Sequence, residues 1–304
     1  MNCQALVSII INNYNYGHFL KGAIESALNQ TYPHTEVIVV DDGSTDNSRE
    51  IIASYTPQVL PVLKENGGQA SAFNAGFAAS IGDIICFLDA DDLFVPDKIA
   101  LVVKTLKDYQ ESTWCFHPLQ LVDTDIKPLE NNDYPGLVYE CDLRLDIKQG
   151  GLRGKLPFAI PGTSGLCFTR SLLQQILPMP EAPAIALNDS YVQFTAISLG
   201  KGFALAKELS LQRVHNNNAY TFKANKQQLV ARINILTAYW MRTNFPSLYK
   251  FTDKLFALGM ATYWRTGDVE TTAQEVIKKY WASSVLPLEK LNIITRVLYY
   301  SLRL

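Results

Sequence analysis

The sequence has little cysteine, and its few thiols are scattered. Five cysteines stand in 304 residues, and no two of them have the C-x-x-C spacing of a zinc or redox site. An odd number of widely separated cysteines argues against a disulfide framework and against structural zinc. A reducing cytoplasm is therefore the expected compartment.

Long hydrophobic runs and an excess of charge of either sign are also absent. The apolar run at residues 6–11 stops at Asn12 and has no basic flank, so it lacks the form of a signal peptide. No stretch approaches the roughly 18 apolar residues of a spanning helix. The 27 basic and 29 acidic side chains leave a net charge of -2, which gives no field for attracting nucleic acid. We expect a cytoplasmic protein that binds no nucleic acid and is attached at most to a membrane surface.

What the chain does have is 48% hydrophobic residues, in two alternating patterns over the first third of its length. Short apolar runs typical of strands occupy residues 7–11, 36–40, 59–63 and 84–88. Helical spacing of apolar residues follows at 20–28, near 51–52, at 70–79 and at 99–106. Strands this apolar that alternate with helices indicate an α/β fold, with a mostly parallel sheet covered by helices on both faces.

The pattern changes twice further along the chain. Residues 111–170 are interrupted by glycines and carry one strand pattern, at 163–169, and a helix opens at Asn188 and Asp189. From about residue 225 onward, the apolar spacing is that of long helices. We therefore predict a first region at residues 1–220 and a C-terminal α-helical region at residues 221–304.

Acidic side chains follow two of the predicted strands. Asp41 and Asp42 come after the second strand, and Asp89, Asp91 and Asp92 come after the fourth. Ligands of parallel sheets bind beyond the carboxyl ends of the strands. Neighbouring carboxylates repel one another, and a divalent cation such as Mg²⁺ or Mn²⁺, which prefers carboxylate oxygens, would compensate the second group. The alternative for both groups is turn and capping chemistry without a ligand.

Four short motifs occur in order along the first part of the chain. They are SIIINNYN at residues 8–15, DDGSTD at 41–46, NAG at 74–76 and LDADD at 88–92. Their order and spacing resemble family 2 glycosyltransferases, strongly over about the first 110 residues and weakly to about residue 220. The resemblance implies a Rossmann-like GT-A fold. In that fold residues 1–110 would bind a nucleotide-sugar, most often a UDP-sugar, and residues 111–220 would bind the acceptor.

The resemblance also implies which residues contact the donor. Asn12 and Tyr14 correspond to positions where the first strand approaches the nucleotide. Asp42 corresponds to the carboxylate that recognises the base, and Asp41 lies beside it. Gly68 stands where some members have a basic or polar contact to the base, a contact that Gln69 would then supply.

Asp89, Ala90 and Asp91 correspond to the Asp-x-Asp motif of the family. The resemblance implies that Asp89 and Ala90 contact the nucleotide-sugar, and that Asp91, with Asp89, holds Mg²⁺ or Mn²⁺ against the diphosphate. Arg213 and His215 correspond to a later Arg-x-His segment. This assigns phosphate binding to Arg213 and a metal or diphosphate contact to His215. The alternative for His215 is an ordinary packed side chain.

The general base of the family is an Asp at the start of a helix in the second half. Asp189 stands at the corresponding distance, but Asn188 replaces the Glu that usually precedes it. The alternative is that Asn188 or Asp189 only caps the helix. With Asp189 as the base, the resemblance implies an inverting, metal-assisted transfer of a hexosyl or hexosaminyl group. The acceptor would be a hydroxyl of a glycan, as in surface-polysaccharide biosynthesis.

Two other functions fit parts of this pattern. A nucleotidyltransferase of related fold would activate a sugar phosphate, but such enzymes usually have a Gly-rich, basic phosphate loop near the first strand. Residues 12–17 contain one glycine and no arginine. A catalytically inactive nucleotide-sugar-binding subunit would explain Asn188, whereas the intact Asp-x-Asp argues against it.

The last predicted helix is amphipathic and basic. Its apolar residues recur at helical spacing, with basic residues among them. The apolar residues are Leu288, Leu291, Ile294, Leu298 and Leu302, and the basic residues are Lys290, Arg296 and Arg303. Such a helix could lie on the inner face of the plasma membrane, where lipid-linked glycan acceptors reside. The alternative is that it packs against the preceding helices or against a second copy in a homo-oligomer.

Overall fold

The first part of the chain forms the strands and helices that its apolar periodicity predicts. The structure, a computed structural model, describes residues 4–109, 111–152, 156–181, 187–215, 218, 226–266, 271–283 and 286–303. The elements up to residue 108 are β1 (Val7–Asn13), α1 (Gly17–Leu28), β2 (Thr35–Asp42), α2 (Ser48–Ser54), β3 (Leu60–Lys64), α3 (Gly68–Ala79), β4 (Ile84–Asp89), β5 (Leu93–Phe94) and α4 (Lys98–Asp108). The predicted strands and helices of this part are confirmed to within a few residues at each end.

The middle of the chain is built from short elements. They are β6 (Trp114–Phe116), β7 (Leu119–Val122), β8 (Val138–Cys141), α5 (Arg144–Lys148), the 3-10 turn η1 (Thr163–Gly165), β9 (Leu166–Thr169), α6 (Arg170–Leu173), α7 (Asp189–Leu199), β10 (Gly202–Leu205) and β11 (Ser210–Arg213). The segment at 163–169 is thus a strand only in its second half. The predicted helix that opens at Asn188 and Asp189 is α7.

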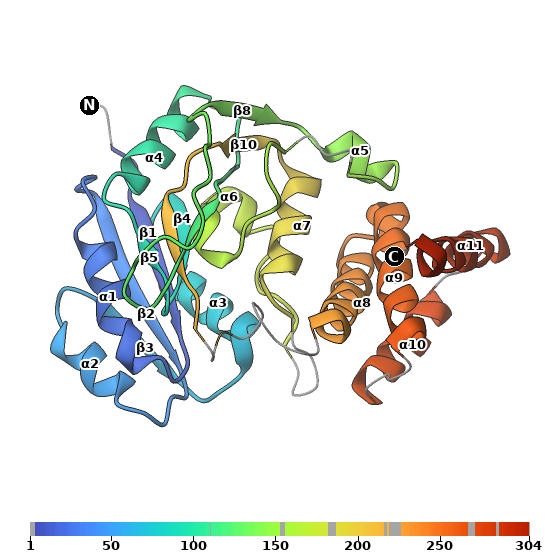
Figure 1. The fold of residues 1–304 in the computed structure, drawn as a ribbon, viewed down its shortest axis with the longest axis horizontal. Coiled ribbons are helices and arrows are strands. Elements are labelled where there is room, and N and C mark those ends of the chain that lie inside the picture. The colour runs from blue at the N-terminus through green and yellow to red at the C-terminus, as the bar shows by residue number, and fades with distance from the viewer. Residues whose placement is uncertain are drawn as a thin grey trace. The chain divides into compact units, whose positions relative to one another are not determined.

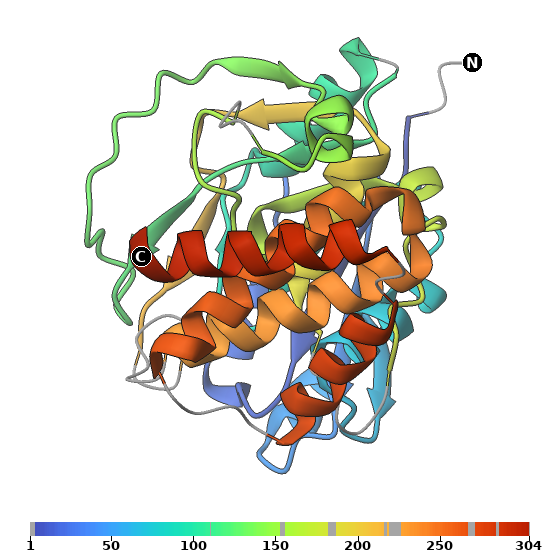
Figure 2. The ribbon, with the colours of Figure 1, turned by 90° about the vertical axis from the view of Figure 1, so that its right-hand side faces the viewer.

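The C-terminal part is helical, as predicted. Its elements are α8 (Lys226–Asn244), the 3-10 turn η2 (Pro246–Leu248), α9 (Tyr249–Thr266), α10 (Thr271–Ser283) and α11 (Pro287–Arg303). Figure 2 shows α11 alongside α9, and the two helices are in contact. Among the described residues, no helix combines the length and the hydropathy that crossing a membrane requires.

The main sheet is mixed, with a parallel half that carries the sequence motifs. Its strand order is β3-β2-β1-β4-β9-β6-β10-β8, and β3, β2, β1 and β4 are all parallel. β9 runs antiparallel between β4 and β6, whereas β6 and β10 are parallel. A second sheet has the order β5-β11-β7. Cys86, Cys167 and Cys115 stand in register on β4, β9 and β6, buried and without disulfides, and Cys3 lies outside the described residues.

Strand alternation decides which side chains at the ends of β1, β2 and β4 share a face. Figure 1 shows α1 and α3 on opposite sides of these strands. Ile10 and Val40 face α3, because a Cβ on Gly76 of that helix would lie 2.4 Å from Ile10 Cγ2 and 3.0 Å from Val40 Cγ2. Every second residue points the same way. Asn12, Asp42 and Asp89 therefore lie on the α3 face, and Asn13 and Asp41 lie on the α1 face.

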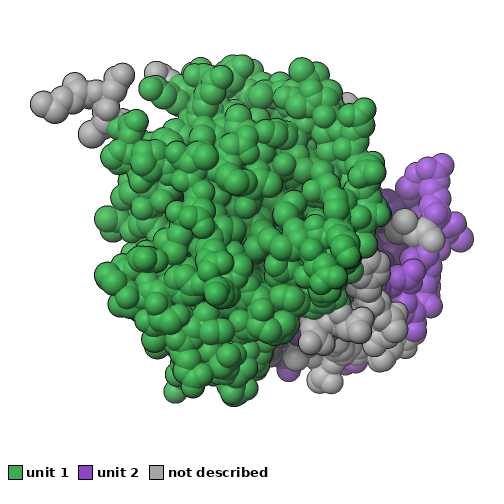
Figure 3. Space-filling model, turned by 60° about the vertical axis from the view of Figure 1, so that its left-hand side comes forward, with its two compact units in different colours: residues 1–142, 154–179, 199–215 green, residues 143–153, 180–198, 216–304 purple. Residues whose placement is uncertain are grey.

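The chain divides into two units, which Figure 3 distinguishes by colour. Unit 1 comprises residues 1–142, 154–179 and 199–215, and unit 2 comprises residues 143–153, 180–198 and 216–304. The last border lies near the predicted start of the helical region at residue 221. Residues 143–153 and 180–198 group with that region as well, because α5 contacts α9 and α7 packs on α8 and α9. Phe194 lies 5.5 Å from Phe251, and Asn244 donates a hydrogen bond to the hydroxyl of Tyr191 (2.9 Å). The split into donor and acceptor halves at residue 110 stays a prediction.

A buried polar cluster ties the helices of unit 2 together. Asp253 of α9 accepts hydrogen bonds from Arg242 Nη1 of α8 (2.9 Å) and from the hydroxyl of Tyr280 of α10 (2.8 Å). Arg242 also pairs with Glu289 of α11. Burial raises the pKa of Asp253 to about 6, although the contacts with Tyr280 and Arg242 act in the opposite direction. One carboxylate in this cluster is therefore poised to titrate in weakly acidic solution.

Asp253→Asn is expected to remove a pH-dependent loss of stability. The folded pKa of about 6 lies above the unfolded value of about 3.9, so folding favours the protonated form. The stability that protonation contributes, at most about 3 kcal/mol, is fully present below about pH 4 and is lost as the pH rises through about 6. The titratable groups that surround position 253 are the same in the wild type and in the variant, so their own titration affects both melting curves alike. They are Arg242, Tyr280, Glu289 and Arg296. In thermal melts between pH 4 and 7, the Tm of the wild type should fall relative to that of the variant, whereas parallel curves would contradict the assignment.

Candidate active site

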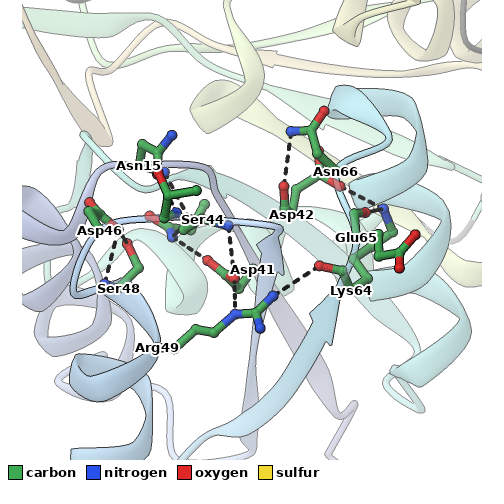
Figure 4. Close-up of polar contacts among 12 residues, drawn as sticks. Asn15, Asp41, Asp42, Ser44, Asp46, Ser48, Arg49, Lys64, Glu65 and Asn66 are labelled. Carbon is green, nitrogen blue, oxygen red and sulfur yellow. Dashed lines mark hydrogen bonds and ion pairs between the residues drawn. The ribbon is translucent and has the colours of Figure 1, made fainter.

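Asp41, at the α1 face of β2, is fully buried and anchors the turn that follows the strand. Its carboxylate accepts hydrogen bonds from Asn13 Nδ2 (2.9 Å), the backbone N–H of Ser44 (3.2 Å) and Arg49 Nε (2.8 Å), as Figure 4 shows for the turn. Burial would raise the pKa of Asp41, but these contacts outweigh it and hold the pKa below its usual value. Asp41 is therefore a charged structural support, and its predicted contact with a nucleotide stays a prediction.

The loops after β1 and β2 are fastened to each other. The side-chain oxygen of Asn15 accepts a hydrogen bond from the backbone N–H of Thr45 (2.8 Å), and the N–H of Asn15 donates to Ser44 Oγ (2.9 Å). Asp46 caps both following helices, since it accepts from the N–H of Gly17 at α1 (2.9 Å) and of Ser48 at α2 (3.0 Å). The DDGSTD motif thus owes much of its composition to turn and cap chemistry.

Asp42 faces the other way and holds the loop that leads into α3. Its carboxylate accepts hydrogen bonds from Lys64 Nζ (2.6 Å) and from the backbone N–H groups of Gly67 (2.9 Å) and Gly68 (2.7 Å). Gly68 has φ +80°, and apart from its chain neighbours and the backbone of its own helix, no atom of the described residues lies within 4 Å of the place where its Cβ would stand. The position of Gly68 is therefore open space. The basic group beside Asp42 comes instead from Lys64, a residue that the sequence analysis did not single out.

Two amide side chains beside these residues have buried polar atoms without a partner. Asn12 stands in register with Asp89, and neither its amide nitrogen nor its amide oxygen has a hydrogen-bond partner among the described residues. Gln69 donates to Thr163 Oγ1 (3.0 Å), but its Oε1 is without a partner in the described part of the chain. An unpaired buried polar group costs about 1–3 kcal/mol, which a ligand that supplies the missing hydrogen bond would recover. Tyr14, the other residue expected here, is 48% exposed.

The predicted metal ligands lie together after β4. The carboxylates of Asp89, Asp91 and Asp92 have oxygens within 4.8 Å of one another. Asp92 is buried, and its oxygens accept hydrogen bonds from Ser164 Oγ (2.7 Å) and from the N–H of Arg213 (3.1 Å). Burial, and then the charge of Asp91, raise the pKa of Asp92 well above its usual range. Like charges gathered on hard oxygen donors are the environment that Mg²⁺ and Mn²⁺ fit.

The backbone of the same turn is joined to β1 and to β11. The N–H of Ala90 donates to the carbonyl of Asn12 (3.1 Å), and Arg213 Nη1 donates to the carbonyl of Asp91 (3.1 Å). His215 Nε2 lies 3.1 Å from Asp91 Oδ2, and the ring of His215 packs 4.7 Å from that of Phe19. The structure thus brings both residues of the Arg-x-His segment to the acidic turn, where His215 contacts the carboxylate expected to bind metal.

Asp189 begins α7 in unit 2, whereas the acidic turn belongs to unit 1. The side-chain oxygen of Asn188 accepts a hydrogen bond from the N–H of Ser190 (3.1 Å), and its carbonyl accepts from the N–H of Tyr191 (3.2 Å). Asn188 is therefore the capping residue of the helix, which gives this position a structural reason for departing from the family pattern. The role of Asp189 as a base stays a prediction.

Comparison with known proteins identifies the family. The family model described as "Glycosyl transferase family 2" matches residues 8–171. An uncharacterized glycosyltransferase of Nostoc sp. is 35% identical over 228 residues, which is 73% of this chain and 69% of the relative. The hyaluronan synthase of Pasteurella multocida is 43% identical over 112 residues, 36% of this chain, and the match spans only 12% of the synthase.

Two solved structures share the fold. The structure of S. aureus TarS 1-349 in complex with UDP-GlcNAc matches with a TM-score of 0.61 at 17% identity and covers 89% of this chain and 78% of TarS 1-349. The mannosyltransferase PcManGT from Pyrobaculum calidifontis, in complex with GDP-Man and Mn²⁺, matches with a TM-score of 0.53 at 17% identity and covers 99% of this chain and 88% of its own. The fold is therefore of the GT-A type, as predicted, and the chain belongs to glycosyltransferase family 2.

Proposed function

We propose that this glycosyltransferase moves a hexosyl or hexosaminyl group from a nucleotide-sugar to a hydroxyl of a glycan acceptor. The preferred donor is a UDP-sugar, and the transfer inverts the anomeric configuration. The observation that carries the proposal is the shared face of Asn12, Asp42 and Asp89 beside the acidic turn. Polar groups at the carboxyl ends of adjacent parallel strands are suited to a nucleotide and its diphosphate. The complexes of TarS with UDP-GlcNAc and of PcManGT with GDP-Man support a nucleotide-sugar donor.

The donor is bound, on this proposal, by groups that differ in chemistry along its length. Asn12 offers an amide donor and acceptor to the base or ribose, and Gln69 offers its unpaired oxygen. Asp42, with Lys64 beside it, recognises the base, and Tyr14, exposed at the end of β1, contacts the nucleotide. Asp89 and Ala90 contact the sugar-diphosphate end, where Arg213 supplies the positive charge for phosphate oxygens.

Asp91, Asp89 and, through its contact with Asp91, His215 would hold Mg²⁺ or Mn²⁺. The Mn²⁺ in the PcManGT complex supports this choice of ion. When bound, the cation neutralises charge that develops on the diphosphate leaving group. Asp92 keeps its place in the turn through Ser164 and is not needed as a ligand.

Asp189 acts on the acceptor. It takes the proton of the acceptor hydroxyl as that oxygen forms a bond to the anomeric carbon, and the bond from that carbon to the diphosphate breaks with its electron pair leaving on the phosphate oxygen. A single displacement of this kind inverts the anomeric configuration.

The proposal is tested by incubating the full chain with radiolabelled UDP-glucose, UDP-GlcNAc and GDP-mannose and following nucleoside diphosphate release with and without a glycan acceptor. We expect release with one donor, stimulated by acceptor. Binding of a donor without any release would instead indicate an inactive binding subunit. Formation of a nucleotide-sugar from a sugar phosphate and a nucleoside triphosphate would indicate a nucleotidyltransferase.

We also propose that the acceptor is a lipid-linked glycan and that α11 lies on the inner face of the plasma membrane. The face of α11 that carries Ile293 and Val297 is buried, and an apolar stripe is exposed on the opposite face. The stripe consists of Leu288, Leu291, Ile294, Leu298, Tyr299 and Leu302. Basic residues flank it on both sides, which suits the boundary between anionic headgroups and acyl chains. They are Lys290, Arg296 and Arg303.

Leu298→Glu is expected to abolish flotation of the full chain with vesicles that contain anionic phosphatidylglycerol. The variant places a charge inside the stripe, whereas the control Asn292→Glu adds the same charge at an exposed polar position of α11 that is not part of the stripe. The wild type and Asn292→Glu should float, and Leu298→Glu should stay at the bottom of the gradient. Equal partitioning of all three proteins would end the membrane proposal. A dimer in solution that Leu298→Glu dissociates would point to a homo-oligomer instead.

A further inference from the structure

Lys98, the first residue of α4, is completely buried in unit 1. Among the described lysines it is the one with 0% exposure. Burial lowers the pKa of Lys98, since removing an ammonium group from water is unfavourable unless its donors are satisfied. Nζ donates to the carbonyl of Ser164 (2.7 Å) and to Ser210 Oγ (3.3 Å), and it lies 3.3 Å from the centroid of the Phe94 ring. The ammonium group is thus fully engaged.

Ser164 connects this buried cation to the acidic turn. On one side, its carbonyl accepts hydrogen bonds from Lys98 and from Ser210 Oγ (2.6 Å). On the other side, its hydroxyl donates to Asp92 Oδ2 (2.7 Å) and accepts from the backbone N–H of Asp89 (3.1 Å). One residue of the η1 turn therefore contacts both Lys98 and the chain segment that carries the predicted metal ligands.

The connection continues to Asp91. Asp92 accepts a hydrogen bond from the N–H of Arg213 (3.1 Å), and Arg213 Nη1 donates to the carbonyl of Asp91 (3.1 Å). The links from Lys98 through Ser164, Asp92 and Arg213 to Asp91 are buried, and the link from Ser164 to Asp89 is partly buried. Buried hydrogen bonds are stronger than those in water, and an unpaired buried group is unfavourable. Movement of Ser164 would therefore reach both Asp89 and Asp91.

We propose that Lys98 is a positioning residue for the metal site. By fixing the carbonyl of Ser164, it sets the spacing of the carboxylates of Asp89 and Asp91, which would otherwise spread apart because they repel one another. The inference rests on the proposed metal site. Groups behind the ligands of a metal typically change its affinity by about 10–100-fold when they are removed.

The experiment measures Mn²⁺ affinity of the full chain without nucleotide, from the electron paramagnetic resonance signal of free Mn²⁺. Lys98→Met keeps an unbranched side chain only one atom shorter and removes the charge and the donors of Lys98. The control Val102→Ala perturbs the buried face of the same helix, and its side chain carries no group that could hydrogen-bond to Ser164. We expect Lys98→Met to weaken Mn²⁺ binding about tenfold or more, and Val102→Ala to leave it within about twofold, at a temperature where both are folded by circular dichroism.

Ser164→Ala provides the second variant, because it removes the hydroxyl contacts and leaves the carbonyl that Lys98 binds. It should weaken Mn²⁺ binding to a similar extent, and the Lys98→Met/Ser164→Ala double variant should be no weaker than either alone. Wild-type affinity in Lys98→Met or in Ser164→Ala, or an equal loss in Val102→Ala, would overturn the proposal. If Lys98→Met does not fold, wild-type affinity in Ser164→Ala would still overturn the proposal, because the connection from Lys98 to the acidic turn passes through the Ser164 hydroxyl. A wild type that binds Mn²⁺ but transfers no sugar would refute the proposed function alone, whereas one that transfers sugar but binds no Mn²⁺ would refute the metal site and, with it, the role of Lys98.

Discussion

Asp91→Ala is expected to lower kcat for sugar transfer by at least about 100-fold while the chain stays folded. Asp91 contacts His215 and is the principal ligand of the proposed cation, so the variant would lose the cation that neutralises the diphosphate. The fold should tolerate the change, because the charge of Asp91 is one of the causes that raise the pKa of the buried Asp92. Removing that charge relieves repulsion and does not leave a buried cation unpaired.

The measurement is the rate of nucleoside diphosphate release at saturating donor, together with a thermal melt. Asp125→Ala is the control, since the side chain of Asp125 is 74% exposed and pairs only with Lys127 at 3.7 Å among the ion pairs of the described residues. Asp125→Ala should keep full activity, and EDTA should inhibit the wild type in the same assay. Activity of Asp91→Ala close to that of the wild type, or a wild type indifferent to EDTA, would remove the metal assignment.

Asp189→Asn is expected to lower kcat by about 10²–10⁴-fold and to leave the affinity for UDP unchanged. An amide cannot take the proton of the acceptor hydroxyl, but it is close to a carboxylate in size. Because Asn188 provides the cap of α7, the variant should keep the melting temperature of the wild type. The separation of kcat from UDP affinity distinguishes a base from a residue that only supports the helix.

Asn188→Ala is the matched control for this prediction. It removes the capping oxygen, which costs about 1 kcal/mol of stability, and it leaves the carboxylate of Asp189 in place. Its Tm should fall while kcat stays within a few-fold of the wild type. Near-normal turnover by Asp189→Asn would remove Asp189 from the proposed mechanism, and the base would have to be sought among other acidic residues.

The parallel half of the sheet could be predicted because its information is local. Each strand from β1 to β4 is a continuous apolar run, and each is followed within a few residues by a helical pattern. The polar residues at the carboxyl ends of these parallel strands then lie at one edge of the sheet, independently of the conformation of the loops. The sequence therefore led to the acidic groups after β2 and β4 without any knowledge of their neighbours, and the resemblance then singled out Asp42, Asp89 and Asp91.

What could not be predicted depends on pairing between distant segments. β9 inserts antiparallel between β4 and β6, and β11 reaches the acidic turn by pairing with the two-residue strand β5 and with β7. Strands of two to four residues show no usable periodicity. For this reason Ser164 and Lys98 were missed, although both lie against the predicted site. Only the resemblance, and not the local pattern, pointed to Arg213 and His215.

The different roles of neighbouring residues of the same type also became clear only from the structure. Asn12 and Asn13 look equivalent in sequence, as do Asp41 and Asp42. Strand alternation turns Asn13 and Asp41 toward each other on the α1 face, where they bond at 2.9 Å, and it turns Asn12 and Asp42 to the α3 face. The face on which each side chain lies decides which member of a pair supports the turn. That face depends on how the strand is oriented relative to its covering helices, which the local sequence does not show.

The repeated passage of the chain between its two units limits how the protein can be shortened. A fragment that stops at residue 215 would retain α5 and α7 but lose α8 and α9, on which they pack. Phe194 would lose its contact with Phe251, and Tyr191 would lose its hydrogen bond from Asn244. The aromatic surface exposed in this way promotes aggregation. Biochemical dissection of this enzyme is therefore better served by point substitutions in the intact polypeptide than by deletion of its helical end.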